Sequence, residues 1–185
     1  MTKDRIQGQK DGLTWPEWRL NANFLQREIV RLWYGKKSIF TLVKGDAENA
    51  EFWELFGVIF FVVVKTFGQA HGLTADEINR RYESAGKACR IFSQHGVVPR
   101  SIPDIFAWLV HWVLGDKLAS EFLFDPQITE IIIVASVAYG HAAEGKMPPY
   151  AKGDNLRPIE FYEGLPVAPE LEGQFYGKNR PNPAA

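Results

Sequence analysis

Four histidines have the widest chemical repertoire of any side chains in this 185-residue chain: His71, His95, His111 and His141. His141 and Glu144 are three residues apart, so a helix through them would place two metal-binding side chains on one face. A di-iron bundle needs this pair twice, in the order Glu-x-x-His, together with two further glutamates. The single reversed copy does not meet that requirement, and we therefore expect no metal and no cofactor.

His111 lies between Trp108 and Trp112 in an apolar segment, where we expect a hydrogen-bonded core histidine. The other two, His71 and His95, flank a predicted helix beside glycines and are expected at helix ends. Histidine is also the usual general acid or base near neutral pH. An alternative function is therefore a small enzyme, or an enzyme subunit, with a site around His111 and His141.

The single cysteine, Cys89, follows the apolar side of a predicted helix, so we expect a buried, inert thiol and no nucleophile. One cysteine allows no intramolecular disulfide and is typical of a reducing compartment. The first thirteen residues are polar, and the longest uncharged apolar run, residues 55–64, is about half the length of a membrane-spanning helix. These features predict a cytoplasmic protein without a membrane span.

Charged residues favour no single ligand class. Glu48, Glu51 and Glu54 form one acidic strip, which is most simply the solvated face of a helix. Basic residues gather in residues 27–44, with aromatic neighbours, and again in residues 80–90, which permits a nucleic-acid-binding accessory protein as a second alternative. The net charge of −1 makes nucleic acid an unexpected partner.

Four capping signals predict where helices begin. Thr14-Trp-Pro-Glu17 and Thr74-Ala-Asp-Glu77 are capping boxes, while Ser101-Ile-Pro-Asp104 and Asp125-Pro126 place a cap just before a first-turn proline. In the first of these helices, apolar residues recur at helical spacing and Gly35 is the expected left-handed terminator. Between them lie polar residues that we expect on the solvated side, namely Arg19, Asn23, Gln26, Arg27 and Arg31.

These signals predict a mainly α fold: a compact bundle or array of five or six helices in residues 14–145, after a flexible leader in residues 1–13. Residues 58–64 and 131–137 are rich in β-branched side chains, so an α+β fold with short central strands there is the alternative. Ser38–Val43 is expected to be a short strand or an extended connector.

Residues 146–185 are predicted to form a long, extended and irregular C-terminal arm. Seven of the eleven prolines lie there, and four glycines interrupt the remainder, so no helix of useful length is expected. The arm also carries aromatic side chains, which disordered linkers usually lack. Its five acidic and five basic residues balance, which favours adhesion through apolar anchors over electrostatic docking.

The lack of a catalytic motif and the aromatic arm together favour a non-enzymatic protein-protein interaction function. We expect a small helical subunit, adaptor or assembly factor whose arm docks on a partner protein or on a sister subunit of a homo-oligomer; packing of the arm on its own body is the competing expectation. No small-molecule ligand is predicted. The expected partner-binding anchors are aromatic. They are Tyr150, Phe161, Tyr162, Phe175 and Tyr176 in the arm, and Trp15 and Trp18 near the N-terminus.

Overall fold

The computed structural model describes residues 15–42, 50–96, 102–143 and 157–176, and within these ranges the chain is helical with no β-strand. The mainly α prediction is therefore confirmed. Residues 58–64 lie inside one long helix and residues 131–137 inside another, so the α+β alternative is wrong. The elements are α2 (Glu17–Trp33), η1 (Ile39–Leu42), α3 (Ala50–Ala70), α4 (Ala75–Gln94), α5 (Ile102–Leu114), α6 (Asp116–Leu123), α7 (Pro126–Ala143), α8 (Ile159–Glu163) and α9 (Pro169–Tyr176).

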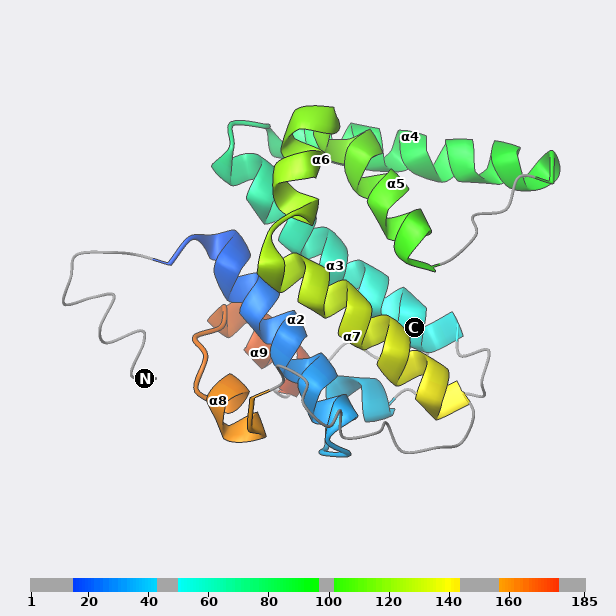
Figure 1. Ribbon diagram of the computed structural model, residues 1–185. Helices are drawn as coiled ribbons and strands as arrows, with labels where there is room; N and C mark the ends of the chain where they lie inside the picture. The colour runs from blue at the N-terminus through cyan, green and yellow to red at the C-terminus, as the bar shows by residue number, and fades with distance from the viewer. Residues whose placement is uncertain (1–14, 43–49, 97–101, 144–156, 177–185) are drawn as a thin grey trace.

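Figure 1 shows two groups of helices. Helices α2, α3 and α7 run roughly side by side, with α2 packed against both of the others. At one end of this layer lie α4, α5 and α6, and at the other end α8 and α9 lie against α2. Helix α2 is therefore enclosed by α3, α7, η1 and the two arm helices.

Two of the predicted caps are present. The side chain of Thr74 accepts a hydrogen bond from the backbone N–H of Glu77 at 3.2 Å, and Oδ1 of Asp125 accepts one from the N–H of Gln127 at 3.0 Å. The first helix begins within its predicted start motif, at Glu17, but its N-cap is Pro16 in place of Thr14, without a side-chain hydrogen bond. Thr14 and Ser101 themselves lie outside the described residues.

Glycines with positive φ lie at several helix ends in the described residues, Gly35 and Gly115 among them. Gly35 has φ 66° and ends α2 as predicted, while Gly115 has φ 80° and separates α5 from α6. Ser38–Val43 was expected to be a strand or an extended connector, and this is wrong: residues 39–42 form the 3₁₀ helix η1. The reason is local, because the backbone N–H of Thr41 donates to the carbonyl of Ser38 at 3.1 Å.

The core is rich in phenylalanine. Phe52, Phe56 and Phe60 follow one another at four-residue spacing on α3, with ring centroids 6.4 and 5.6 Å apart. Phe106 of α5 and Phe122 of α6 pack edge-on against Phe60, at 5.2 and 5.8 Å. This aromatic column joins the two groups of helices into one core.

Helix α3 is also the one helix in the described part of the chain that is long and apolar enough to cross a membrane, over Phe52–Ala70. Length and composition alone support that statement, and buried core helices of globular proteins meet the same criterion.

The column generates a stability prediction with a matched control. Replacing fully buried Phe56 by alanine should lower the free energy of unfolding by about 3–5 kcal/mol, because it removes a large side chain and leaves a cavity. Phe124, 83% exposed, should change it by less than about 0.5 kcal/mol on the same substitution. Denaturant unfolding of both variants measures the difference, and equal effects would contradict the described core.

Candidate functional site

Helix α2 is buried on its polar side as well as on its apolar side. All residues from 21 to 30 are buried. The prediction that the polar residues of this helix face solvent is therefore wrong for the middle of the helix, because the arm contacts Asn23 and Arg27 and α7 contacts Gln26. Five of the buried side chains are polar or charged: Asn21, Asn23, Gln26, Arg27 and Glu28.

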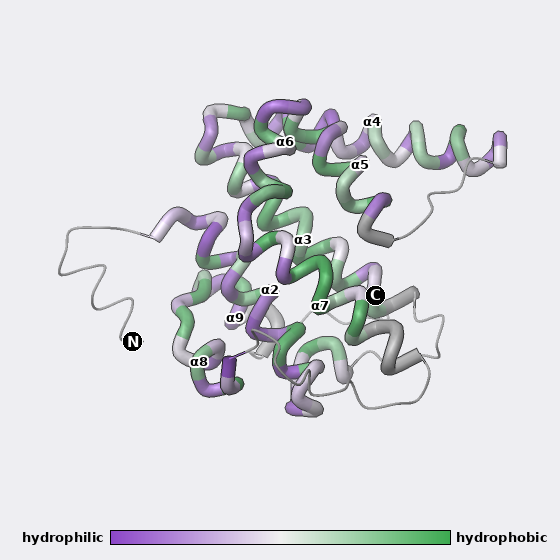
Figure 2. Tube along the Cα trace, viewed as in Figure 1, coloured by the Kyte–Doolittle hydropathy of each residue, from purple (hydrophilic) through white to green (hydrophobic). Residues whose placement is uncertain are grey.

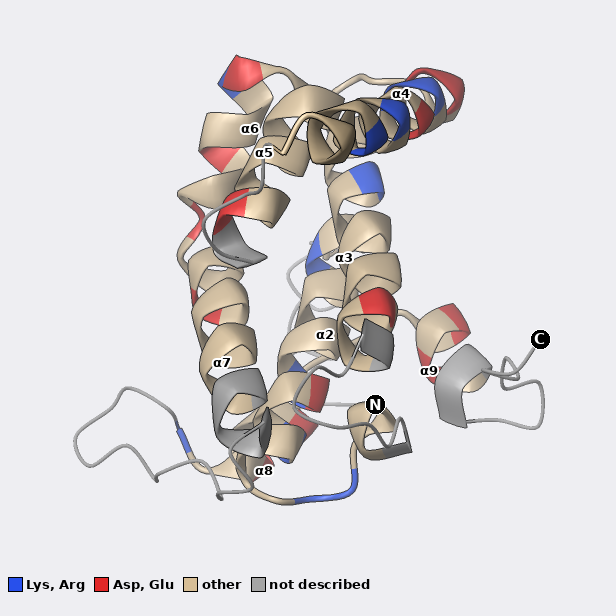
Figure 3. Cartoon of the chain, turned by 90° about the vertical axis from the view of Figure 1, so that its right-hand side faces the viewer, with Lys and Arg blue, Asp and Glu red and all other residues tan. Residues whose placement is uncertain are grey.

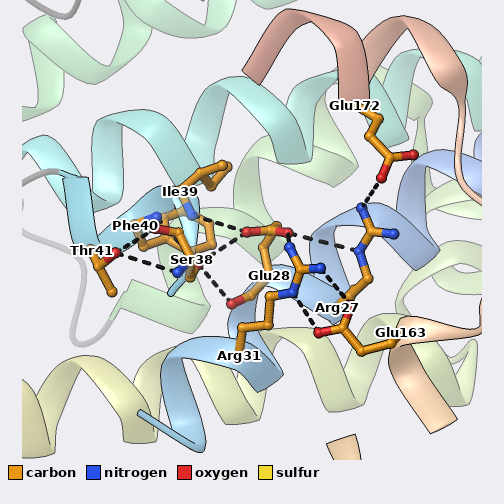
Figure 4. Close-up of polar contacts among 9 residues, drawn as sticks. All are labelled: Arg27, Glu28, Arg31, Ser38, Ile39, Phe40, Thr41, Glu163 and Glu172. Carbon is orange, nitrogen blue, oxygen red and sulfur yellow. Dashed lines mark hydrogen bonds and ion pairs between the residues drawn. The ribbon is translucent and has the colours of Figure 1, made fainter. Parts of the chain in front are cut away.

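Glu28 is the most deeply buried charge, at 0% exposure (Figure 4). Its Oε1 accepts a hydrogen bond from Nη1 of Arg31 at 2.8 Å. Its Oε2 accepts bonds from the backbone N–H of Ile39 at 3.0 Å and from the hydroxyl of Ser38 at 3.1 Å. Since a buried carboxylate is costly without partners, these contacts hold η1 against α2.

Arg27 and Arg31 extend this network to the arm (Figure 4). Arg31 binds Glu163 of α8 with two hydrogen bonds, from Nε at 2.7 Å and from Nη2 at 2.5 Å. Arg27 donates from Nη2 to Glu172 of α9 at 3.2 Å, while its Nε lies 3.8 Å from Glu28. The hydrogen bond and charge of Arg31 lower the pKa of the Glu163 carboxyl. The carboxylate of Glu28 thus contacts both of the arginines that bind the arm.

Apolar contacts complete the arm interface. Ile159 and Tyr162 of α8 pack on Val30 of α2 in a small separate cluster, whereas Val167 and Leu171 join the main core. Two arm carbonyls also accept hydrogen bonds from the body. The side-chain amide of Asn23 binds the carbonyl of Pro166 at 3.0 Å, and the hydroxyl of Tyr34 binds that of Arg157 at 2.9 Å.

A second polar network links α2 to α7. Arg19 binds both carboxylate oxygens of Asp125, at 3.0 and 2.7 Å. Burial alone would raise the pKa of Asp125, but Arg19 and the backbone N–H groups of the α7 N-terminus bring it below its usual value. Farther along α7, Glu130 accepts from Gln26 at 2.9 Å and from the hydroxyl of Tyr162 at 3.4 Å, and burial raises the pKa of this carboxyl. The α7 network therefore also reaches the arm.

The expected aromatic anchors differ in how far they are buried. Trp18 and Tyr162 are buried within this chain, so their surface is used by its own fold. Trp15 and Phe161 are exposed, and the guanidinium of Arg157 lies 4.2 Å from the centre of the Phe161 ring. Tyr150 lies outside the described residues, as do the side chains of Phe175 and Tyr176 at the end of α9.

The described part of the arm fits the predicted irregular arm, except that it contains short helices. Its described part is irregular only between and before two short helices, α8 and α9, although no useful helix was expected there. Proline residues begin both of them: Pro158 precedes α8, and Pro169 is the first residue of α9. Proline breaks helix interiors but fits the first turn, where its missing N–H has no partner to lose.

The candidate catalytic side chains do not form a site in the described residues. His111, expected in the core, has a side chain that is 41% exposed and lies 3.1 Å from the exposed carboxylate of Asp116. His71 is hydrogen-bonded to the carbonyl of Phe67 at the end of α3, while the side chain of His141 lies outside the described residues. No group of three or more metal-binding side chains occurs in the part of the chain that the structure describes.

Cys89 is exposed on α4, so the prediction of a buried thiol is wrong. The apolar stripe was identified correctly, because Ile78 and Ala85 on the same stripe are fully buried. No element covers the stripe at Cys89 in the described structure. Partial burial raises the pKa of this thiol, which keeps it protonated and unreactive at neutral pH.

Sequence reasoning missed the residues that hold the arm, although one signal for them exists. The arm as a whole is neutral, but residues 157–173 contain four glutamates and a single arginine. The net charge of residues 157–173, taken separately from the rest of the arm, is negative, and it indicates that this segment could pair with basic residues such as Arg27 and Arg31. Compared with protein-family models, curated proteins and solved structures, the chain matches none.

Breaking the Glu28 network should be costly. Replacing Glu28 by alanine should lower the free energy of unfolding by about 3–5 kcal/mol, because two arginines and the turn at η1 lose a buried partner. Glu160, which is exposed on α8, provides the control and should change it by less than about 0.5 kcal/mol on the same substitution. Thermal or denaturant unfolding tests this, and a small effect at Glu28 would contradict the role given to its contacts.

The arm should loosen in acid. Because the folded pKa of Glu163 is below its ordinary value of 4.5, the ion pair with Arg31 contributes fully above that value and is lost as pH falls through the folded value. The Glu163→Gln variant should be less stable than the parent at pH 7, and the difference should shrink as the pH falls below 4.5 and through the lowered pKa of Glu163. Thermal unfolding from pH 7 to pH 3 measures this, and comparison with the parent cancels the contribution of Asp125. A difference that grew in acid would contradict the assigned pair.

Proposed function

We propose that this chain is a non-enzymatic interaction protein: a small helical subunit, adaptor or assembly factor whose arm docks on α2 of a sister subunit in the way it docks on its own α2. The observation that supports the proposal is the charged clasp between Arg31 and Glu163 and between Arg27 and Glu172. We use the name arm clasp for these two pairs. A cytoplasmic location accompanies the proposal, supported by the single cysteine.

The surface beneath the arm suits reversible docking. Asn23, Arg27 and Arg31, which bind the arm, are polar and can be hydrated when it leaves. Val30 is the apolar residue of α2 in the small cluster with α8. Interfaces of this mixed composition resemble contacts between separable domains more than an obligate core. Departure of the arm would therefore expose these polar side chains, together with the part of the core that Val167 and Leu171 cover.

A sister subunit offers the arm the same contacts as its own body. Such exchange of an identical element is domain swapping, and it needs no new interface chemistry. The thirteen residues 144–156 join α7 to the described part of the arm, and fully extended they could span roughly 45 Å. In Figure 1 the end of α7 and helix α8 lie on opposite sides of the molecule.

Neither alternative function gains comparable support. The pair of His111 and Asp116 is exposed, and an acid-base pair would need an enclosed environment to tune it. Three of the basic residues of the nucleic-acid hypothesis are committed to ion pairs: Arg27 and Arg31 to the arm, and Arg81 to Glu77.

Shortening the connector separates self-docking from exchange. Deleting residues 145–155 leaves two residues, which reach only about 11 Å and cannot carry the arm back to its own α2. We expect this variant to form dimers, with the amide protons of α8 protected from exchange. Native mass and hydrogen exchange measure the two properties.

The control carries the same deletion with Glu163→Ala and Glu172→Ala, which remove the arm clasp. It should return to a monomer with an unprotected α8. If the shortened chain with an intact clasp is itself a monomer with an unprotected α8, docking on a sister subunit is refuted.

A further inference from the structure

The second half of α4 stands away from the body. Every residue from Gly86 to Gly96 is exposed except half-buried Ala88. We name this segment, residues 86–96, the α4 overhang. It projects beyond α5 in Figure 1, and in Figure 2 hydrophobic and hydrophilic bands alternate along it. A helix that leaves the core normally becomes polar all round, and this one does not.

Large apolar side chains lie uncovered on the overhang. Ile91 is 53% exposed and Phe92 is 40% exposed. The ring of Phe92 is 6.0 Å from that of Trp108 on α5, and Trp108 is 5.2 Å from Trp112, which is also exposed. These four residues define an aromatic docking surface that runs from α4 on to α5. Exposed apolar patches of this kind mark interaction sites.

Two features fix the position of this surface. The indole N–H of Trp112 donates to the hydroxyl of Ser84 on α4 at 2.9 Å. One turn earlier, Arg81 donates to the carbonyl of Val113 at 3.0 Å and to Glu77 of its own helix. The junction of α4 with α5 is thus bonded, so the docking surface is held in place before any partner arrives, which reduces the entropy lost on binding.

The charged side chains of the α4 overhang have one sign. Lys87 and Arg90 are both exposed, and neither forms an ion pair within the part of the chain that the structure describes. From Ser84 to Gly96 the sequence contains no aspartate or glutamate, whereas the first half of α4 carries Asp76, Glu77 and Glu83. In Figure 3 the end of α4 nearest the viewer shows blue bands, with the red bands farther along the helix.

From this apolar surface with unpaired cations we infer that the α4 overhang and α5 form a docking site for an acidic amphipathic helix of a partner protein. The apolar face of such a helix would pack on Phe92, Ile91 and the two tryptophans as a third helix beside α4 and α5. Its carboxylates would pair with Lys87 and Arg90. The inference rests on the proposed interaction role, but its site lies at the opposite end of the molecule from the arm.

Other occupants fit the docking surface less well. Nucleic acid would be held by two cations, which is few for tracking a phosphate backbone, and the aliphatic Ile91 offers no ring for base stacking. An anionic membrane binds helices along an apolar face that is free over its whole length. Here the first half of that face, with Ile78 and Ala85, is already inside the core.

The test uses the full chain and a defined probe: a fluorescein-labelled, 18-residue helical peptide with leucines on one face and glutamates flanking them. A second peptide has lysine at every glutamate position. Fluorescence anisotropy should show that the acidic peptide binds at least about tenfold more tightly than the basic one, and that added salt weakens this preference. Equal binding of the two peptides, or none, would overturn the inference.

Variants assign the binding to the surface. Lys87→Glu with Arg90→Glu, and separately Ile91→Ala with Phe92→Ala, should each weaken binding of the acidic peptide about tenfold. The charge-matched control, Arg80→Glu with Lys117→Glu, alters exposed residues outside the surface and should leave binding unchanged. All four positions of the test variants are exposed, so circular dichroism should show an unaltered fold.

Competing ligands complete the design. If a single-stranded oligonucleotide or phosphatidylserine vesicles bind through Lys87 and Arg90 while the acidic peptide does not, the assigned partner class is wrong. The outcome is also separable from that of the arm. If the chain exchanges its arm but does not bind the acidic peptide, only the inference about the α4 overhang is contradicted. If it binds the peptide but does not exchange its arm, only the proposed arm exchange is contradicted.

Discussion

A carboxylate with no access to solvent is the constraint on which the rest of this structure depends. Glu28 lies in the middle of α2 at 0% exposure, where an unpaired charge would be prohibitive. Its two oxygens are satisfied by Arg31, the backbone of Ile39 and the hydroxyl of Ser38. The first contact orients an arginine toward the arm, and the other two set the path of the chain after α2. One buried charge therefore specifies contacts in three separate segments.

The same helix divides its surface between two kinds of packing. On one side, Ala22, Leu25 and Ile29 belong to the hydrophobic core that includes α3 and α7. On the other, arginines and amides meet the glutamates and carbonyls of the arm. Apolar packing accepts many different apolar partners, whereas paired charges and hydrogen bonds require a partner with a matching arrangement of polar groups. Specificity in the arm contact thus comes from electrostatic pairing, where sequence reasoning had expected apolar anchors alone.

Local features of the fold were accessible from sequence, and distant contacts were not. The Thr74 and Asp125 caps involve neighbours within three residues, and the β-branched runs in α3 and α7 are helical because the segments around them are. By contrast, Arg31 and Glu163 are 132 residues apart. Nothing in the spacing of either residue indicates the other. The same holds for Cys89, whose apolar stripe was evident although the absence of a covering element was not.

The exposed apolar face of α4 needs a different explanation from the buried polar face of α2. The polar side of α2 is accounted for within the chain, because each charged group there meets a partner of opposite sign. On α4 the stripe continues past Ala85 to Phe92 while the covering helices do not. Ile91 and Phe92 leave 53% and 40% of their surface exposed, although Phe92 also packs against Trp108, and this exposed apolar surface adds a risk of aggregation. A contact outside the chain would offset that cost, which makes the overhang, more than the arm, the surface that we propose for a different protein.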